Sequence, residues 1–217
     1  MRNKTIKVFA IMTSLACGTA LQAATRYWSN AGGDSRWSNS ANWTSSLKPS
    51  SNDVVYLANN CSDEPQNIIL DEDAWLSQID CRATGNRHYT ITPENDAFMR
   101  LNSIVGSSSR TVDLTINADI RVALEYLRVR AYGGTTTLNG RVFPSPGERE
   151  SMYLIAHYDN PLALGGSNTF THVMCQDNAN IVVKNPHALG QGYVRTTDCS
   201  VRGLLTLQTN VVVKGSL

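Results

Sequence analysis

From residue 53 onward the chain is a succession of short apolar segments, and this pattern constrains the fold more than any other feature. The segments are rich in β-branched residues and are separated by Asn, Gly, Asp, Ser or Pro. Such a texture predicts an all-β chain. The expected strands are DVVYL (53–57), NIIL (67–70), HYTIT (88–92), TVDLTIN (111–117), IRVALEYLRVRAY (120–132), TTTLNG (135–140), SMYLIAHY (151–158), NIVVKN (180–185) and LLTLQTNVVVKG (204–215).

The segment 120–132 is the one stretch that also fits a helix. Its apolar residues alternate at first and then slip by one place, which a bulge in a strand explains as well as a helix does. Strand-like sequence flanks it on both sides, so we interpret it as a bulged strand.

Two β architectures fit these strands. An antiparallel β-sandwich uses hairpin turns, whereas a solenoid stacks successive coils and places Asn and Gly at the coil corners. Several segments end in Asn followed by a turn residue, and a two-residue Asn-Gly hairpin signal occurs only at 139–140. The pattern favours the solenoid, and the sandwich stays open as the alternative.

Residues 1–24 have the three-part pattern of a secretory leader. The cationic start MRNKTIK precedes the apolar run VFAIMTSLACGTAL, which is too short to span a bilayer, and QAA supplies small residues for cleavage. We expect cleavage near Ala23 or Ala24, export, and a mature chain without a membrane span.

Export changes how the cysteines are interpreted. Removing the leader leaves an even set, Cys61, Cys81, Cys175 and Cys199, in an oxidising compartment. Two disulfides are expected; all three pairings stay open, although the spacing favours local pairs. No cysteine has a partner at zinc-ligand spacing, so no metal site is expected.

Residues 162–192 form a unit with distinctive spacing. Its opening, inner strand and close are carried by Leu164, Gly166, Asn168, Thr169, Phe170 and Thr171, then Ile181, Val182 and Val183, then Asn185, Ala188, Leu189, Gly190 and Gly192. A Trp/Asn-rich segment follows the leader, with Trp28, Gly32, Gly33, Trp37, Ala41, Asn42, Trp43, Pro49 and Asp53. Together the two regions resemble the autotransporter-associated β-strand repeat family. The chain departs from that family's unit at 172–174, where Gly-Gly-Thr is usual.

The resemblance implies a right-handed parallel β-helix exposed at or beyond a bacterial cell surface, usually as one section of a longer passenger. It divides the chain into a leader (1–24), an N-terminal cap (25–60) and β-helix coils (61–217). The last segment leaves an apolar face that no later segment covers. We therefore expect further repeats or a membrane barrel beyond this sequence, or pairing with another copy.

Three of the four tryptophans, Trp28, Trp37 and Trp43, lie in a stretch made mostly of Ser, Asn, Gly and Ala. A solenoid needs its open end covered, and large rings supply much buried area, so we expect these indoles to cap the first coil. The competing interpretation is a surface on which they stack against a glycan. Trp75 is expected to be a core or edge residue.

Charge and motifs exclude several function classes. The chain has 19 Lys and Arg against 18 Asp and Glu, a net charge of +1, which gives no field for nucleic acid. The acidic run Asp63, Glu64, Asp71, Glu72 and Asp73 is a candidate calcium site, although acidic surface turns are the commoner use of such a run. No catalytic constellation and no cofactor motif is found, so no enzyme activity is expected.

We therefore expect a secreted or cell-surface, non-enzymatic, adhesin-like scaffold. Its partner would be an extracellular glycan or the surface of a host or neighbouring cell. The alternative is a polysaccharide-binding or polysaccharide-cleaving β-helix protein of the pectin-lyase type.

Overall fold

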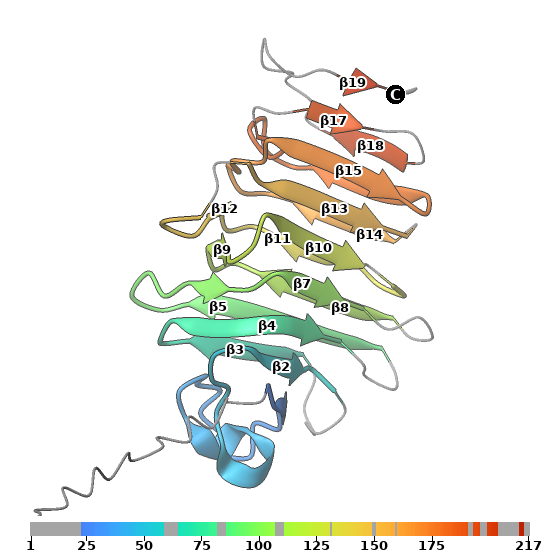
Figure 1. Cartoon of the computed structure of the whole chain (residues 1–217). Helices are drawn as coiled ribbons and strands as arrows, with labels where there is room; N and C mark the ends of the chain where they lie inside the picture. Colours follow the sequence, from blue (N-terminus) through green and yellow to red (C-terminus); the bar gives the residue numbers. More distant parts are fainter. Residues whose placement is uncertain are drawn as a thin grey trace, which may run out of the picture.

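The computed structural model of the 217-residue chain describes residues 23–58, 65–81, 86–106, 111–130, 132–148, 151–158, 160–190, 193–195, 199–203 and 213–214. Over these ranges the chain winds into a β-solenoid of about six turns, whose strands stack along one axis (Figure 1). Neighbouring coils pair in parallel, as in the pairs of β5 (Arg87–Pro93) with β8 (Val112–Ile116) and of β10 (Tyr126–Arg130) with β13 (Tyr153–His157). The predicted all-β solenoid is confirmed, and the antiparallel sandwich is wrong.

The described elements are nearly all strands, joined by short corners. Two 3₁₀ turns, η1 (Ser40–Asn42) and η2 (Thr44–Ser46), lie in the N-terminal cap. The strands are β1 (Thr25–Tyr27), β2 (Asp53–Tyr56), β3 (Gln66–Leu70), β4 (Ala74–Asp80), β5 (Arg87–Pro93), β6 (Met99–Arg100), β7 (Ser103–Val105), β8 (Val112–Ile116), β9 (Ile120–Val122), β10 (Tyr126–Arg130), β11 (Thr136–Leu138), β12 (Val142–Pro144), β13 (Tyr153–His157), β14 (Pro161–Leu164), β15 (His172–Gln176), β16 (Ala179–Val183), β17 (Tyr193–Arg195), β18 (Cys199–Gly203) and β19 (Val213–Lys214).

Two sheets wrap around the solenoid axis. One has the order β18-β16-β14-β11-β8-β5-β3; the other runs β12-β9-β6-β4-β7-β10-β13-β15-β17-β19, with β1 and β2 joined beside β4. Strand β4 serves two walls, because its start pairs with β6 and its end pairs with β7. A middle coil therefore has three walls, as in β8, β9 and β10.

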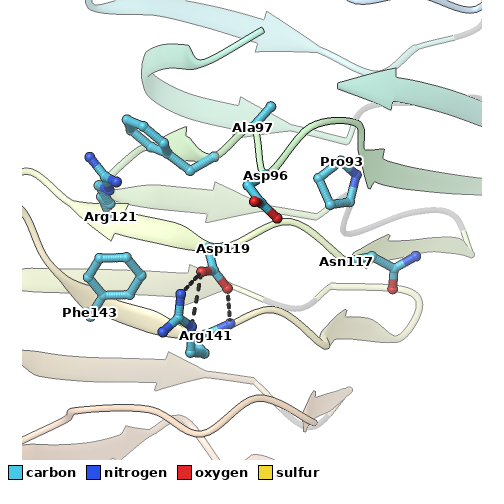
Figure 2. Close-up of a pocket in the computed structure, with 9 residues that line it drawn as sticks. Pro93, Asp96, Ala97, Asn117, Asp119, Arg121, Arg141 and Phe143 are labelled. Carbon is cyan, nitrogen blue, oxygen red and sulfur yellow. Dashed lines mark hydrogen bonds and ion pairs between the residues drawn. The ribbon is translucent and has the colours of Figure 1, made fainter. Parts of the chain in front are cut away.

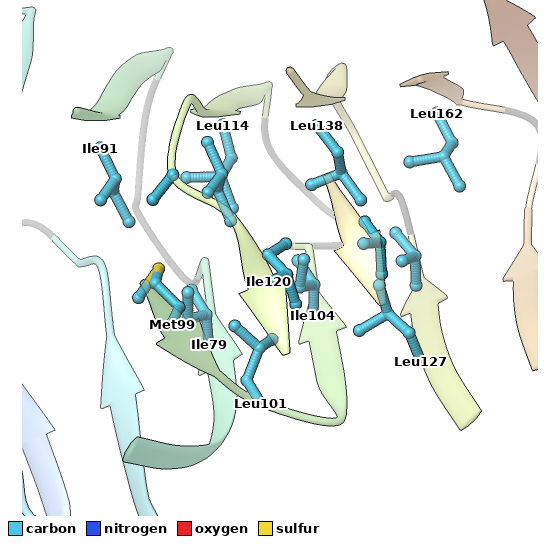
Figure 3. Packing of buried hydrophobic residues seen from close by; sticks show 14 of the residues in the cluster. Ile79, Ile91, Met99, Leu101, Ile104, Leu114, Ile120, Leu127, Leu138 and Leu162 are labelled. Atoms are coloured by element: carbon cyan, nitrogen blue, oxygen red, sulfur yellow. The ribbon is translucent and has the colours of Figure 1, made fainter. Parts of the chain in front are cut away.

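Aliphatic side chains fill the interior in columns that run from coil to coil. One column has members 19 to 26 residues apart in the chain, each on the strand next to the previous one: Ile68, Ile91, Ile116, Leu138, Leu164 and Val183. Figure 3 shows Ile91, Leu114, Leu138 and Leu162 along one wall, facing Ile104, Ile120 and Leu127. Burying each such side chain contributes about 1.5–3 kcal/mol, so each coil is stabilised by its neighbours.

The corners explain the Asn and Gly punctuation of the sequence. The amide of Asn139 donates to the side-chain oxygen of Asn117 one coil below, at 2.9 Å. Gly140 and Gly166 stack at a corner where a Cβ atom on either would lie 2.0 Å from the carbonyl oxygen of the coil beneath. Only glycine allows the backbones to approach so closely.

Residues 120–132 correct the prediction of one bulged strand. The chain forms β9, then bends at 123–125, then forms β10. The slip in alternation is therefore a coil corner, at which Leu124 is 50% exposed. No helix among the described residues is long and apolar enough to cross a bilayer.

Candidate functional site

The three N-terminal tryptophans are buried beneath the first coil. Trp28, Trp37 and Trp43 are 0%, 1% and 1% exposed, and their rings pack edge to face, with centroids 5.1 Å (Trp28 to Trp43) and 4.7 Å (Trp37 to Trp43) apart. The Trp43 indole N–H donates to the Trp37 carbonyl at 2.9 Å. The interpretation as an end cap agrees with this burial. The glycan-stacking interpretation of these rings is wrong, because none of them presents a face to solvent.

The N-terminal cap also covers the open edge of the first coil. The Trp37 N–H donates to the Ile69 carbonyl at 2.9 Å, and the Ile69 N–H donates to the Ser35 carbonyl at 2.8 Å. Residues 35–37 thus act as a short additional strand beside β3, the last strand of its sheet. Since unpaired strand edges invite association, the N-terminal cap removes that liability as well as covering the core.

Polar residues of the N-terminal cap are held by buried carboxylates. Asp53 is 2% exposed and accepts from the Ala24 N–H at 2.8 Å, the Ser50 N–H at 2.9 Å and Arg26 Nε at 3.1 Å. Burial by itself raises the pKa of Asp53, but these hydrogen bonds outweigh burial and hold the pKa below its ordinary value. Asp53 is therefore a charged anchor for the start of the described fold.

The described part of the acidic run is also structural. Asp71 accepts from Ser38 Oγ at 2.6 Å and from Arg36 at 3.1 Å, Glu72 pairs with Lys48, and Asp73 accepts from a backbone N–H. The carboxylates point to different partners, and within the described ranges no group of His, Cys, Asp and Glu could hold a metal ion. The other two members of the run, Asp63 and Glu64, lie outside the described residues.

The cysteines depart in part from the expected local pairs. Cys81 is a free, buried thiol, so the local pair of Cys61 with Cys81 that the spacing favoured is wrong, and so is the expectation of two disulfides among these four cysteines. Burial, together with the charge of Asp80, raises the pKa of the Cys81 thiol well above its ordinary value, which makes it unreactive. Cys175 is disulfide-bonded. The side chains of Cys61 and Cys199 lie outside the described residues.

A groove on the side wall of the solenoid was not found from the sequence. It has a volume of about 480 Å³ and crosses three successive coils, from the corner after β5 through β9 to β12 (Figure 2). We call it the lateral groove. Its lining residues are Pro93, Asp96, Ala97, Phe98, Asn117, Asp119, Arg121, Arg141 and Phe143.

Arg121 is one of the lining residues of the lateral groove, and its Nε makes no hydrogen bond in the part of the chain that the structure describes. Its guanidinium carbon lies 3.5 Å from the Phe98 ring centroid and 5.7 Å from that of Phe143. Within the described residues no hydrogen bond or ion pair engages this guanidinium, and its Nε is buried without a partner. A buried unpaired donor is costly, and its place in the groove lining makes Arg121 the candidate residue for meeting an acceptor there.

The second arginine of the lateral groove is already neutralised. Arg141 Nε donates to Asp119 Oδ2 at 3.0 Å, and the Arg141 N–H donates to Asp119 Oδ1 at 2.8 Å; Figure 2 marks this pair with dashed lines. Burial raises the pKa of Asp119, but the contacts with Arg141, together with the nearby charge of Arg121, outweigh burial and lower the pKa below its ordinary value. Asp96, also in the lining, is exposed.

A row of outward side chains leads from the lateral groove toward the N-terminal cap. By register, Trp75, Arg100, Arg121 and Phe143 occupy adjacent rungs of one wall. Trp75 is 48% exposed on the last rung of this wall, so the edge interpretation of Trp75 holds and the core interpretation is wrong. The alternation of buried Ala74, exposed Trp75 and buried Leu76 was the available signal.

Another wall carries an arginine of similar type. Arg128 lies on β10 with its guanidinium carbon 5.3 Å from the Tyr126 ring centroid, and its Nε is also buried without a partner. Arg128 is not among the residues that line the lateral groove. It therefore provides a matched control for Arg121.

The lateral groove combines a planar cation, phenyl rings, the ion pair of Asp119 with Arg141, and the exposed carboxylate of Asp96. An unengaged guanidinium fork matches the geometry of a carboxylate or phosphate, and the volume lies in the range of small-ligand sites, about 300–1,000 Å³. No family model matches this chain, and neither a curated protein nor a solved structure matches it.

Proposed function

We propose that this protein is a secreted or cell-surface structural scaffold of adhesin-like character, without enzyme activity. The observation that carries the proposal is the parallel stack of coils closed at its N-terminal end by three buried indoles. Such a stack is stiff along its axis and presents regular rows of side chains on its walls. A protein that displays contact surfaces away from a cell needs these properties.

The position of the first strand supports export. β1 begins at Thr25, directly after the predicted cleavage region, and the Ala24 nitrogen lies 2.8 Å from the buried carboxylate of Asp53. Cleavage after Ala23 would turn that nitrogen into an ammonium group beside Asp53. The new chain end would then gain an ion pair with a buried carboxylate.

The unit at 162–192 supports the resemblance to surface-exposed repeats. Asn168 is buried, accepts from the Val142 N–H at 2.7 Å and donates to the Ala188 carbonyl at 2.7 Å. It thus joins the opening of the unit to its close and to the coil beneath. Gly190 has φ +71° and passes so near to Phe170 that a Cβ atom would lie 2.3 Å from the Phe170 carbonyl oxygen. Asn168 and Gly190, two of the residues that carry the resemblance, thus have roles that the coil geometry requires.

The test is expression of the chain with its own leader in a Gram-negative host. We expect export and a mature N-terminus at Ala24 or Thr25, read by mass spectrometry. We also expect the exported chain to be folded, and particles coated with it to adhere to cells. The matched control is Ile11→Arg, which breaks the apolar run of the leader and should leave the chain unprocessed. An unprocessed wild-type chain that stays in the cytosol would contradict the proposal.

A second candidate function, saccharide binding, is favoured by the lateral groove rather than by the tryptophans. The sequence also left polysaccharide cleavage open as an alternative, but no comparable observation favours it.

A further inference from the structure

We propose that the lateral groove binds an acidic saccharide, a sugar chain that carries carboxylate groups, with Arg121 as the carboxylate-binding residue. This binding activity goes beyond the scaffold role and does not depend on it. Arg121 has a buried Nε that makes no hydrogen bond within the described residues.

Arg121 is already oriented for a ligand. Its guanidinium stacks on Phe98, with the carbon 3.5 Å from the ring centroid, while Phe143 lies beyond it at 5.7 Å. Stacking fixes the plane of the guanidinium, and its donors lie in that plane. A carboxylate that enters the lateral groove would therefore accept two parallel hydrogen bonds with little ordering left to do.

The other charges select the kind of anion. Asp119 is neutralised by Arg141, whereas Asp96 is exposed in the same lining. With Arg121 and Asp96 the lateral groove is close to neutral overall, so a multiply charged phosphate would gain from one residue and be repelled by another. A group with one negative charge fits this balance better.

The remaining polar groups suit hydroxyls. Asp96 supplies carboxylate oxygens that accept hydrogen bonds, and Asn117 supplies both a donor and an acceptor. A saccharide unit offers several hydroxyls beside its carboxylate. The lateral groove crosses three coils in a volume of about 480 Å³, which accommodates a short oligosaccharide rather than a single small anion.

The experiment is calorimetric titration of the full chain with matched trisaccharide pairs. Each pair has the same sugar and linkage, and its members differ only in bearing a carboxylate or a hydroxymethyl group at C6; gluco, galacto and manno pairs are used. We expect at least one acidic trimer to bind, and its neutral partner to bind on the order of 10- to 100-fold more weakly, as expected for charge-assisted hydrogen bonds.

Variants then assign the binding to Arg121. Arg121→Gln should weaken binding of the acidic trimer by a similar factor. Arg121→Lys should recover only part of the lost affinity, because lysine restores the charge but cannot donate two parallel hydrogen bonds. Arg128→Gln, the matched control on another wall, should leave the affinity unchanged. Thermal melting of each variant verifies that it is folded.

Four results would overturn the inference. Equal affinity for acidic and neutral trimers would make the site one for neutral sugars. Equal affinity for inorganic phosphate and for the acidic trimer would make it a simple anion site. Absence of binding in all three pairs by the folded chain, or binding that Arg121→Gln leaves intact, would remove the lateral groove as an acidic-saccharide site.

Discussion

The N-terminal cap and the lateral groove are built from the same kinds of side chain, aromatic rings and arginines, and use them in opposite ways. In the N-terminal cap the three indole rings are buried, and Arg26 and Arg36 each pair with carboxylates. In the lateral groove Phe98 and Phe143 stay partly exposed, and Arg121 has no ion pair within the described residues. Satisfied donors distinguish a structural cluster from a binding site more reliably than residue type does.

The position in the solenoid explains this difference. The first coil has no coil before it, so its apolar face must be covered by other residues, and the N-terminal cap supplies them. The middle coils already shelter one another. Rings on their outer wall, such as Phe143, are not needed to exclude water from the core and are free to serve another purpose.

The largest effect is expected for Trp43→Ala in the N-terminal cap. Removing an indole that is 1% exposed leaves a cavity beneath the first coil, so the free energy of unfolding should fall by about 3–5 kcal/mol. Urea unfolding measures the change. Trp75→Ala is the control, since that ring is 48% exposed, and a loss of similar size there would contradict the contrast between buried and displayed rings.

The N-terminal cap could be anticipated from sequence because its signals are local. Three tryptophans in a polar stretch, directly before a strand, have few uses other than covering an end. The solenoid was likewise predictable from strand texture and from the Asn and Gly corners, since each coil repeats these features within 19 to 26 residues.

The lateral groove could not be anticipated, because it depends on which residues of different coils become neighbours. Arg121 meets Phe143 on the next rung and Phe98 in the coil before, and coil lengths vary, so no fixed spacing reveals these contacts. The expected Cys61 to Cys81 pair was wrong for a related reason: Cys81 turns into the core, where the neighbouring coils bury it.

A second contrast concerns carboxylates. Asp53→Asn removes the charged acceptor of Arg26 and of two backbone N–H groups in a site that is 2% exposed, so stability should fall by about 1.5–3 kcal/mol. The counterpart in the lateral groove, Asp119→Asn, breaks an exposed pair with Arg141 and should cost about 0–1 kcal/mol. Equal losses in chemical unfolding would mean that the lateral groove is as structural as the N-terminal cap.

Acid should loosen the N-terminal cap before the lateral groove. The pKa values of Asp53 and Asp71 are lowered in the folded chain by hydrogen bonds that outweigh burial; the pKa of Asp119 in the lateral groove is lowered too, but its ion pair is more exposed and contributes less stability. A carboxylate whose pKa is lowered by folding stabilises the folded chain at pH values above its unfolded pKa of about 3.9. That stability is lost as the pH falls below about 3.9 and through the folded pKa. Hydrogen exchange measured from about pH 5 down to about pH 2 should show β1 and residues 35–37 losing protection first. Earlier loss in β9 and β12 would contradict this order.

The smallest effect is expected for Arg121→Gln, and it bears most directly on the difference between the two regions. The substitution removes no hydrogen bond or ion pair within the described residues; it loses the stacking on Phe98 and also removes a buried, unpaired Nε. These two contributions oppose each other, so the free energy of unfolding should change by no more than about 0.5 kcal/mol. Urea unfolding of the full chain without ligand measures it. A loss above about 1.5 kcal/mol, the range of a satisfied charged hydrogen bond, would make Arg121 a structural residue like those of the N-terminal cap.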